Sequence, residues 1–288
     1  MSLRSATQRF LAQENLNFLL TNRIPRHAST RFMGWFAKLR NPLVRVPSIA
    51  LWRFFCDVNL TDSAKAEFSS LHDAFTRALV PGARSFDAAP EVLASPCDAI
   101  VGALGEVRGG QAFQIKGMDY ALADLLGDAA QAEEFAEGQF ITLRLTAGMY
   151  HRFHAPHDLT VEEVRYISGD TWNVNPVALK RVERLYCRNE RAPIKVRLDS
   201  DGASLMLVPV AAILVASIRL PFVDDKQPVR SLHQRVWRDE VRFAKGEEMG
   251  WFEHGSTIVM LAPKGFLPVE GIATGTVIEA GRALLKRV

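Results

Sequence analysis

The hydrophobic pattern separates a helical beginning of the chain from a body rich in strands. Early apolar residues recur every three or four positions between basic and polar ones, as on one face of an amphipathic helix. This spacing predicts helices over residues 5–22, 28–40, 47–58 and 62–79. Pro25 ends the first helix, Pro47 fits a first turn, and Asp62 or Ser63 fits a helix start. The chain therefore begins with a predicted lead of short helices, residues 1–60.

Later in the chain, apolar residues alternate with polar ones or form short uninterrupted runs. Ile141, Leu143 and Leu145 alternate with polar neighbours, which predicts a strand with one buried face. Strands are predicted over 141–145, 161–167, 194–198, 205–220, 236–243 and 257–261, with turns at 169–170, 199–202 and 245–246. Two further helices are predicted over 119–136 and 276–286. The predicted fold class is α+β, a mainly antiparallel β body (61–288) behind the helical lead.

The positive charge of the chain is concentrated in the lead. The 288 residues carry a net charge of +3, yet residues 1–55 hold nine Lys and Arg against a single acid, Glu14. Trp35 and Phe36 stand among these cations. Two interpretations stay open: helices that pack on the body, or a membrane-associating surface with aromatics among lipid headgroups and cations on anionic lipid. Nucleic acid is not an expected partner, because the basic residues are confined to the lead.

The sequence predicts no membrane span, secretion signal or disulfide framework. The longest apolar run, 205–218, is broken by Pro209 and is shorter than the roughly 20 residues that cross a bilayer. Cys56, Cys97 and Cys187 lie far apart and form no CxxC pair. The beginning of the chain lacks the apolar core of a signal peptide. We expect a peripheral protein in a reducing, cytoplasmic setting.

A glycine–serine pair opens the last predicted strand. Gly255 can adopt backbone angles closed to other residues, so Ser256 can be held in a strained turn before the apolar run 258–261. A serine hydroxyl is a weak nucleophile until a base removes its proton. A plain hairpin turn is the alternative explanation of this pair.

Residues that could activate this serine lie far upstream. His151, His154 and His157 are three residues apart, and positions at that spacing on a strand face opposite sides. A zinc site built from all three would therefore need an irregular backbone. Asp98 precedes an apolar stretch and either forms a turn or orients a histidine. Together with Ser256, these residues are the inventory of a Ser-His-Asp device.

Six ordered blocks between residues 94 and 262 form a more specific pattern than the triad alone. They are Ser95-Pro96-Cys97-Asp98, Gln114-Ile115-Lys116-Gly117, Tyr150-His151-Arg152-Phe153-His154-Ala155-Pro156, Gly169-Asp170-Thr171-Trp172-Asn173-Val174-Asn175, Asn189-Glu190-Arg191 and Lys245-Gly246-Glu247-Glu248-Met249-Gly250-Trp251-Phe252. The motif Gly255-Ser256-Thr257 closes the set. In these blocks the chain resembles the bacterial type of the phosphatidylserine decarboxylase family, pyruvoyl-dependent enzymes that make phosphatidylethanolamine.

Two positions depart from the pattern of that family. Its bacterial motif usually reads Leu-Gly-Ser-Thr, whereas His254 stands in the first position here. The family often has Ala-Asp-Gly where this chain has Cys97-Asp98-Ala99. Neither change removes a reacting group, but His254 adds a titratable side chain beside the scissile bond.

The resemblance implies a proenzyme that makes its cofactor from its own backbone. His154, oriented by Asp98, would take the proton of Ser256, and the serine oxygen would attack the Gly255 carbonyl. Such a base contributes roughly 10²–10⁴-fold in rate. This serine-protease-like self-cleavage would leave a covalent pyruvoyl group derived from Ser256. The products would be chains 1–255 and 256–288 of the same precursor.

The resemblance further implies a carbon–carbon lyase that acts on a membrane lipid. Phosphatidylserine would bind the pyruvoyl carbonyl through a Schiff base and lose CO₂, with His151 as the proton donor. No metal ion is expected. The lead would hold the enzyme on an anionic membrane surface, peripheral to the cytoplasmic side of the cell membrane, and a homodimer stays open. The alternatives are a catalytically inactive, membrane-peripheral lipid-binding relative and a zinc hydrolase built on the histidine cluster.

Overall fold

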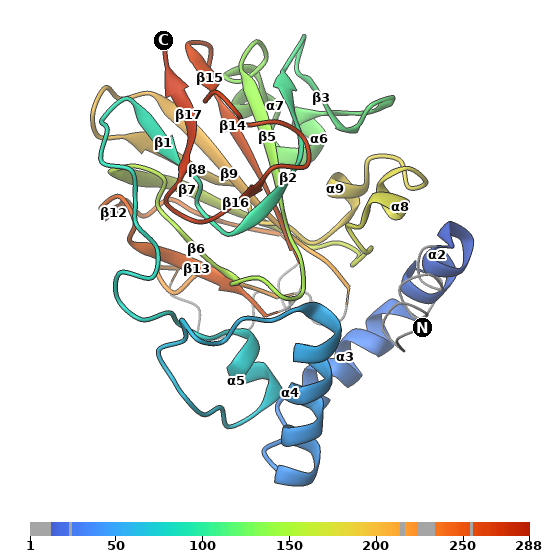
Figure 1. Cartoon of the computed structure of the whole chain (residues 1–288). Helices are drawn as coiled ribbons and strands as arrows, with labels where there is room; N and C mark the ends of the chain where they lie inside the picture. Colours follow the sequence, from blue (N-terminus) through green and yellow to red (C-terminus); the bar gives the residue numbers. More distant parts are fainter. Residues whose placement is uncertain (1–12, 23–24, 214–216, 224–233, 254–255) are drawn as a thin grey trace.

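A large antiparallel sheet forms the centre of the body (Figure 1). The structure, a computed structural model, describes residues 13–22, 25–213, 217–223, 234–253 and 256–288. The strands of the large sheet follow the order β11 (Gln234–Trp237), β7 (Leu159–Ile167), β8 (Ile194–Leu198), β9 (Ser204–Ala211), β14 (Ser256–Ala262), β5 (Gln139–Leu145), β2 (Ala99–Glu106) and β16 (Val277–Ile278), while β12 (Val241–Phe243) also pairs with β7. Ser256 opens β14, an inner strand, so the sheet itself positions the candidate nucleophile.

Both faces of the sheet are buried around β9 and β14, which explains the long apolar runs of these two inner strands. Every residue of β14 is buried. Ile258 and Met260 belong to one apolar cluster, whereas Val259 and Leu261 belong to another. Burial of each such side chain contributes roughly 1.5–3 kcal/mol. A strand buried on both sides needs no polar face, and the strand predicted over 257–261 is confirmed.

Smaller elements cover the two faces of the sheet. The first cluster includes residues of two three-stranded sheets, β1 (Val92–Ala94) with β17 (Ala283–Arg287) and β15 (Phe266–Pro268), and β10 (Ile218–Arg219) with β13 (Glu248–Phe252) and β6 (Arg152–His154). The second cluster includes residues of the hairpin β3 (Gln111–Ile115) and β4 (Met118–Ala121), and of helices α6 (Leu122–Leu126), α7 (Ala129–Glu133), α8 (Pro176–Leu179) and α9 (Leu185–Arg188). The body is thus a central sheet with β layers on one face and short helices on the other.

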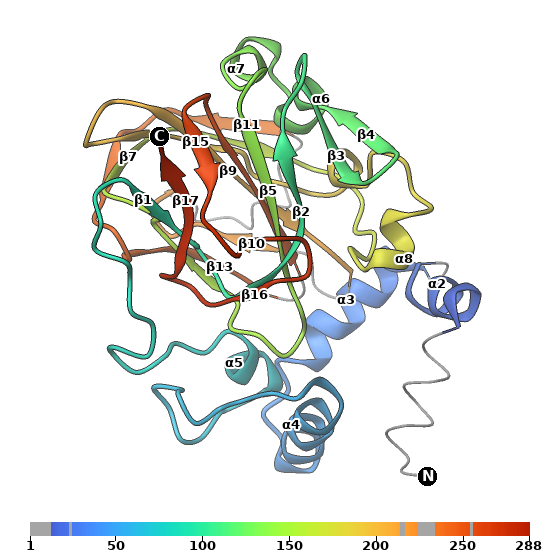
Figure 2. The ribbon, with the colours of Figure 1, turned by 45° about the horizontal axis from the view of Figure 1, so that its top comes forward.

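The N-terminal helices lie beside one end of the sheet (Figure 2). They are α2 (Glu14–Asn22), α3 (Arg26–Phe36), α4 (Pro42–Cys56) and α5 (Leu71–Phe75). The side chain of Asn41 accepts a hydrogen bond from the Leu43 N–H and caps α4, and Asp57 ends it in a left-handed conformation with φ of 51°. Helix α4 buries none of its residues: Leu43 is 85% exposed, and Trp35 on α3 is 60% exposed. Across the described ranges, no helix is long and apolar enough to span a membrane.

The lead helices predicted from the sequence are largely confirmed. Helices α2, α3 and α4 overlap the predicted segments, although residues 1–12 lie outside the described part of the chain. Pro47 lies inside α4 and not in its first turn, because Asn41 and Pro42 start the helix five residues earlier.

The helix predicted over 62–79 is wrong except for α5. Ser63 forms a bridge with Leu79, so the segment folds back on itself as a loop. The hydroxyl of Ser70 accepts a hydrogen bond from the Asp73 N–H, so Ser70 caps this short helix in place of Asp62 or Ser63. Phe68, Leu71 and Phe75 are buried although only Leu71–Phe75 is helical, so burial of a non-helical segment produced the apolar spacing that suggested a long helix.

Two other predicted helices are also corrected. Residues 119–136 contain the end of β4 and helices α6 and α7, because Gly127 ends α6 with a left-handed φ of 66°. Residues 276–286 hold strands β16 and β17, and β17 pairs with β1 and β15. The predicted strands over 205–220 and 236–243 each divide into two strands.

Candidate active site

Ser256 occupies a buried position at the end of an inner strand. It pairs with Leu145 on β5 and Ala211 on β9. Its side chain is fully buried, and among the described residues its Oγ has no hydrogen-bond partner. His254 and Gly255, the other residues of the predicted cleavage motif, lie outside the described residues. A buried hydroxyl without a partner costs roughly 1–3 kcal/mol, which marks this atom as a candidate for chemistry.

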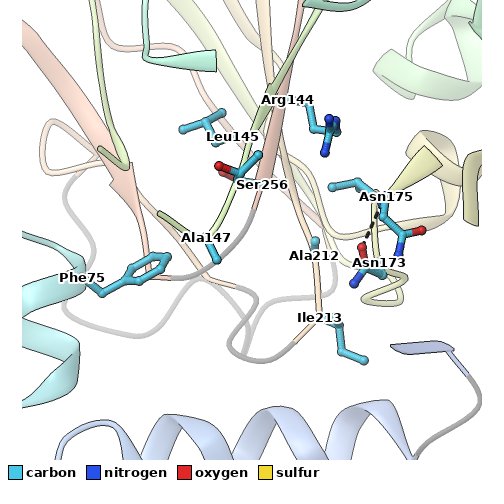
Figure 3. A pocket seen from close by; sticks show the side chains of 11 residues that line it. Phe75, Arg144, Leu145, Ala147, Asn173, Asn175, Ala212, Ile213 and Ser256 are labelled. Carbon is cyan, nitrogen blue, oxygen red and sulfur yellow. Dashed lines mark hydrogen bonds between the residues drawn. The ribbon is translucent and has the colours of Figure 1, made fainter. Parts of the chain in front are cut away.

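A cavity of about 270 Å³ opens beside Ser256 (Figure 3). Its walls combine apolar and polar residues: Phe75, Leu145, Ala147, Val174, Ala212 and Ile213 with Arg144, Thr146, Asn173 and Asn175. The Asn175 N–H donates to Asn173 Oδ1 at 2.8 Å, which fixes the loop on the polar side (Figure 3). A mostly apolar pocket with a few convergent polar groups is typical of small-molecule sites.

His151 lies behind the apolar wall of this cavity. It is fully buried, and its ring contacts Phe75 with 4.0 Å between ring centroids. Its Nδ1 lies 2.8 Å from the Met149 carbonyl oxygen, and its own carbonyl accepts from the Phe252 N–H at 3.0 Å. Because a carbonyl can only accept, Nδ1 carries the hydrogen and Nε2 is the acceptor nitrogen of the neutral ring. The structure thus brings His151 to the wall of the Ser256 cavity and to the segment before the predicted cleavage site.

His154 has a different set of neighbours. Its Nδ1 lies 3.0 Å from the Gly246 carbonyl oxygen, and its Nε2 lies 3.1 Å from the Tyr150 hydroxyl. The ring therefore donates a hydrogen bond through Nδ1 and accepts one from the Tyr150 hydroxyl at Nε2. Burial lowers the pKa of His154, although the Gly246 carbonyl and the charges of Glu248 and Asp98 act in the opposite direction. A neutral imidazole at pH 7 is the form that a general base requires.

Asp98 is held by groups other than the two histidines. Arg84 donates from Nε and Nη2 to the two carboxylate oxygens at 2.8 and 2.6 Å, and the Ala280 N–H donates to Oδ1 at 2.9 Å. The backbone N–H of His154 donates to the Pro96 carbonyl oxygen at 2.8 Å, and this hydrogen bond keeps β6 beside the Asp98 segment. Within the described part of the chain, no hydrogen bond joins Asp98, His154 and Ser256 to one another. The catalytic triad therefore stays a prediction.

The histidine cluster does not converge on one point. His157 directs its two ring nitrogens towards the carbonyl oxygens of Asp158 and Pro90, at 3.1 and 2.9 Å. Within the described ranges, no group of three His, Cys, Asp or Glu side chains is placed so that it could hold a metal ion. Each of the three histidines therefore contacts a different set of neighbours.

Comparison with known proteins identifies the family. The sequence model of the family described as phosphatidylserine decarboxylase matches residues 71–286. The chain belongs to the phosphatidylserine decarboxylase family. Similar relatives are the phosphatidylserine decarboxylase proenzymes of Marinobacter nauticus (38% identical over 72% of this chain and 74% of the relative), Alcanivorax borkumensis (38%, over 84% and 85%) and Saccharophagus degradans (33%, over 94% and 97%).

In this member of the phosphatidylserine decarboxylase family, the sequence pattern did not indicate the roles of several site residues. Arg84 is one, because nothing in its surroundings along the chain marks it as the partner of Asp98, fourteen residues away. Tyr150 was noted within a block, but its hydroxyl contact with His154 was not expected. Arg144 fell on the polar face of the strand predicted over 141–145, where a charged side chain is ordinarily exposed, so nothing in the sequence marked it as a site residue.

The lead of this decarboxylase family member contacts the polar wall of the cavity directly. Asn22 accepts a hydrogen bond from the Asn173 N–H at 3.0 Å. Arg26 forms an ion pair with Asp170 at 2.6 Å, and its guanidinium lies 3.8 Å from the centroid of a Trp172 ring. Helix α2 and the start of α3 therefore fix the loop from which Asn173 and Asn175 reach the cavity.

Proposed function

We propose that the chain is a proenzyme that cleaves itself between Gly255 and Ser256 and then decarboxylates phosphatidylserine to phosphatidylethanolamine. The observation that carries this proposal is the buried Oγ of Ser256, which has no partner in the described part of the chain and lines a cavity at a strand end. A serine placed there can react with the peptide before it and afterwards face a bound ligand.

The surroundings of Ser256 fit the pyruvoyl group that the family implies. Pairing with Leu145 and Ala211 holds the backbone of residue 256 from both sides, and the neighbouring cavity leaves room for a small substrate head. A pyruvoyl group supplies a carbonyl that binds an amine and accepts the electrons released when CO₂ leaves. The surrounding strands would exclude water from that carbonyl.

His154 and Asp98 are assigned to self-cleavage. The lowered pKa keeps His154 neutral at pH 7. Its Nε2, which accepts from the Tyr150 hydroxyl in the structure, would exchange that partner for Ser256 Oγ and take the serine proton while the oxygen attacks the Gly255 carbonyl carbon. Asp98 contributes a negative charge that favours the protonated form of His154. Arg84 and the Ala280 N–H hold this carboxylate in a fixed orientation.

His151 is assigned to the proton delivered after CO₂ has left. The Met149 carbonyl accepts the Nδ1 hydrogen, so Nε2 is the ring nitrogen assigned to carry the transferred proton. Phe75, which the ring contacts, also lines the cavity, so the imidazole lies one side chain away from the site of decarboxylation. Separate surroundings for the two histidines support separate roles.

The lead is assigned to a peripheral position on an anionic membrane surface at the cytoplasmic side. Large apolar residues are exposed along α3 and α4, among them Phe32, Trp35, Leu43, Leu51 and Phe54. Exposed apolar side chains beside cations suit the boundary between headgroups and acyl chains. A substrate whose acyl chains stay in the bilayer requires an enzyme that rests on that boundary.

The test of the proposed function is the intact mass of the purified protein under denaturing conditions. We expect chains 1–255 and 256–288, with the shorter chain beginning with pyruvate, and release of CO₂ from phosphatidylserine. Ser256→Ala should remain a single chain. A short chain that begins with unmodified serine would contradict the proposal, as would an uncleaved wild-type protein.

A further inference from the structure

Arg144 places a positive charge on the wall of the Ser256 cavity (Figure 3). In the described part of the chain, its guanidinium takes part in no hydrogen bond and no ion pair. The side chain is half-buried, and burial lowers the pKa of Arg144 against the opposing effect of Tyr186. The group nevertheless stays charged, because an arginine pKa lies far above neutrality. A partly desolvated charge that lacks a protein partner favours an anionic ligand.

Arg144 and Ser256 flank the same strand end from opposite faces. Arg144 pairs with Thr257, whereas Leu145 pairs with Ser256. Paired residues share a face of the sheet and consecutive residues alternate, so the two side chains leave the sheet on different sides. Figure 3 shows them on either side of the strand end, both lining the one cavity. A ligand bound at the start of β14 can therefore extend around the strand end to the guanidinium.

A second donor faces the cavity from the loop opposite Arg144. Asn173 uses its Oδ1 to accept the Asn175 N–H, and its Nδ2 donates to no group within the described ranges. Asn175 uses both ends of its amide within the protein: its Oδ1 accepts from the Ala178 N–H, and its Nδ2 donates to Asn17 Oδ1. Asn175 thus positions the loop, while the amide of Asn173 keeps donors for a ligand.

We propose that Arg144 and the amide of Asn173 bind the phosphodiester of the lipid headgroup, an assignment that rests on the decarboxylase function proposed above. In phosphatidylserine, two carbons and an ester oxygen separate the reacting amine from the phosphorus. The amine would lie at residue 256 and the phosphodiester would lie around the strand end. A planar guanidinium suits a phosphate, which it can bind through two parallel hydrogen bonds.

The seryl carboxylate is the other anion of the substrate, and the chemistry disfavours it as the ligand of Arg144. Decarboxylation converts the carboxylate into neutral CO₂, so a cation on it would stabilise the ground state more than the transition state. The phosphodiester keeps its charge throughout the reaction. Arg144 therefore contributes binding that is equal in both states, which lowers KM and leaves kcat nearly unchanged.

The experiment compares cleaved wild-type protein with Arg144→Met and Arg144→Lys. We expect the KM for phosphatidylserine in mixed micelles to rise about tenfold or more in Arg144→Met, since hydrogen bonds to charged groups contribute roughly 1.5–3 kcal/mol. The value of kcat should change by less than about threefold, and Arg144→Lys should recover part of the loss. Calorimetry with dihexanoyl-phosphatidylethanolamine, which has the phosphodiester but no carboxylate, should show the same loss of affinity.

Arg108→Met is the matched control, because Arg108 is exposed, pairs with Glu106 and lies outside this cavity. It removes the same charge from the protein and should change neither constant. An unchanged affinity of Arg144→Met for the phosphatidylethanolamine would overturn the assignment, and so would a fall in kcat without a rise in KM. Wild-type protein that releases no CO₂ would instead reject the decarboxylase function, while the calorimetric comparison would still test Arg144.

Discussion

The carboxylate of Glu253 stands two residues before the predicted cleavage bond and is held by a histidine and an arginine. Its Oε1 lies 3.3 Å from His72 Nε2 on α5 and 3.2 Å from Arg219 Nε on β10. The side chain is 8% exposed. Burial alone would raise the pKa of Glu253, but the hydrogen bond with His72 and the charges of Arg219 and Lys38 outweigh it and lower the pKa to about 2.

The depressed pKa translates into stability that depends on pH. The ordinary value is 4.5, and each pKa unit corresponds to about 1.4 kcal/mol, so the ionised Glu253 stabilises the fold by an amount on the order of 3 kcal/mol at pH 7. The folded state releases its proton more readily than the unfolded state. This stabilisation is therefore complete above about pH 4.5 and disappears as the pH falls towards 2.

We expect Glu253→Gln to lower the thermal midpoint by several degrees at pH 7, since 1 kcal/mol corresponds to about 2–4 °C in a protein of this size class. The assay is thermal unfolding of the cleaved protein, followed by circular dichroism between pH 3 and 8. Glu240→Gln is the control, because Glu240 is exposed and lies 3.9 Å from its partner Arg197. The reasoning is refuted if Glu253→Gln and Glu240→Gln unfold alike at pH 7, or if the difference grows below pH 4.5.

The other predictions concern cleavage, turnover and the membrane. Asp98→Ala and His154→Ala should accumulate uncleaved precursor on denaturing gels, and normal cleavage in either variant would show that the triad is misassigned. His151→Ala should still cleave substantially but release CO₂ about 10²-fold more slowly, the low end of what a positioned acid supplies; wild-type turnover would make His151 structural. Replacing both Leu51 and Phe54 by Asp should weaken sedimentation with anionic vesicles while cleavage continues, and unchanged sedimentation would exclude α4 as the anchor.

The sequence predicted those parts of the fold in which local pattern and burial agree. The run 257–261 is apolar because both faces of β14 are covered, and length and flanking turn residues were enough to predict a strand. The helix predicted over 276–286 failed because β17 pairs with β1 and β15, contacts that no local window contains. Segment 119–136 failed because Gly127 ends a helix that its apolar spacing would continue.

In the candidate site, too, local pattern was predictable from the sequence and long-range contacts were not. The position of Ser256 at the start of a buried strand was predicted from a glycine–serine pair before an apolar run, and the structure places it there. The carbonyl that fixes the His154 ring belongs to Gly246, and the two residues are 92 positions apart. The ordered blocks predicted that these residues belong together, but which atom faces which depends on how β6 and β13 pair.

The inner position of β14 has a consequence for the protein after cleavage. The short chain would remain an inner part of the sheet, with seven residue pairs to β5 and six to β9, and its last strand would stay paired with β1 of the long chain. Pulling it out would expose both apolar clusters and leave β5, β9, β2 and β1 each with one partner strand fewer. The cut would thus change the covalent connectivity and leave the topology intact. Native mass spectrometry should then detect a complex that contains both chains and no free short chain. The two chains should separate only when the sheet itself unfolds.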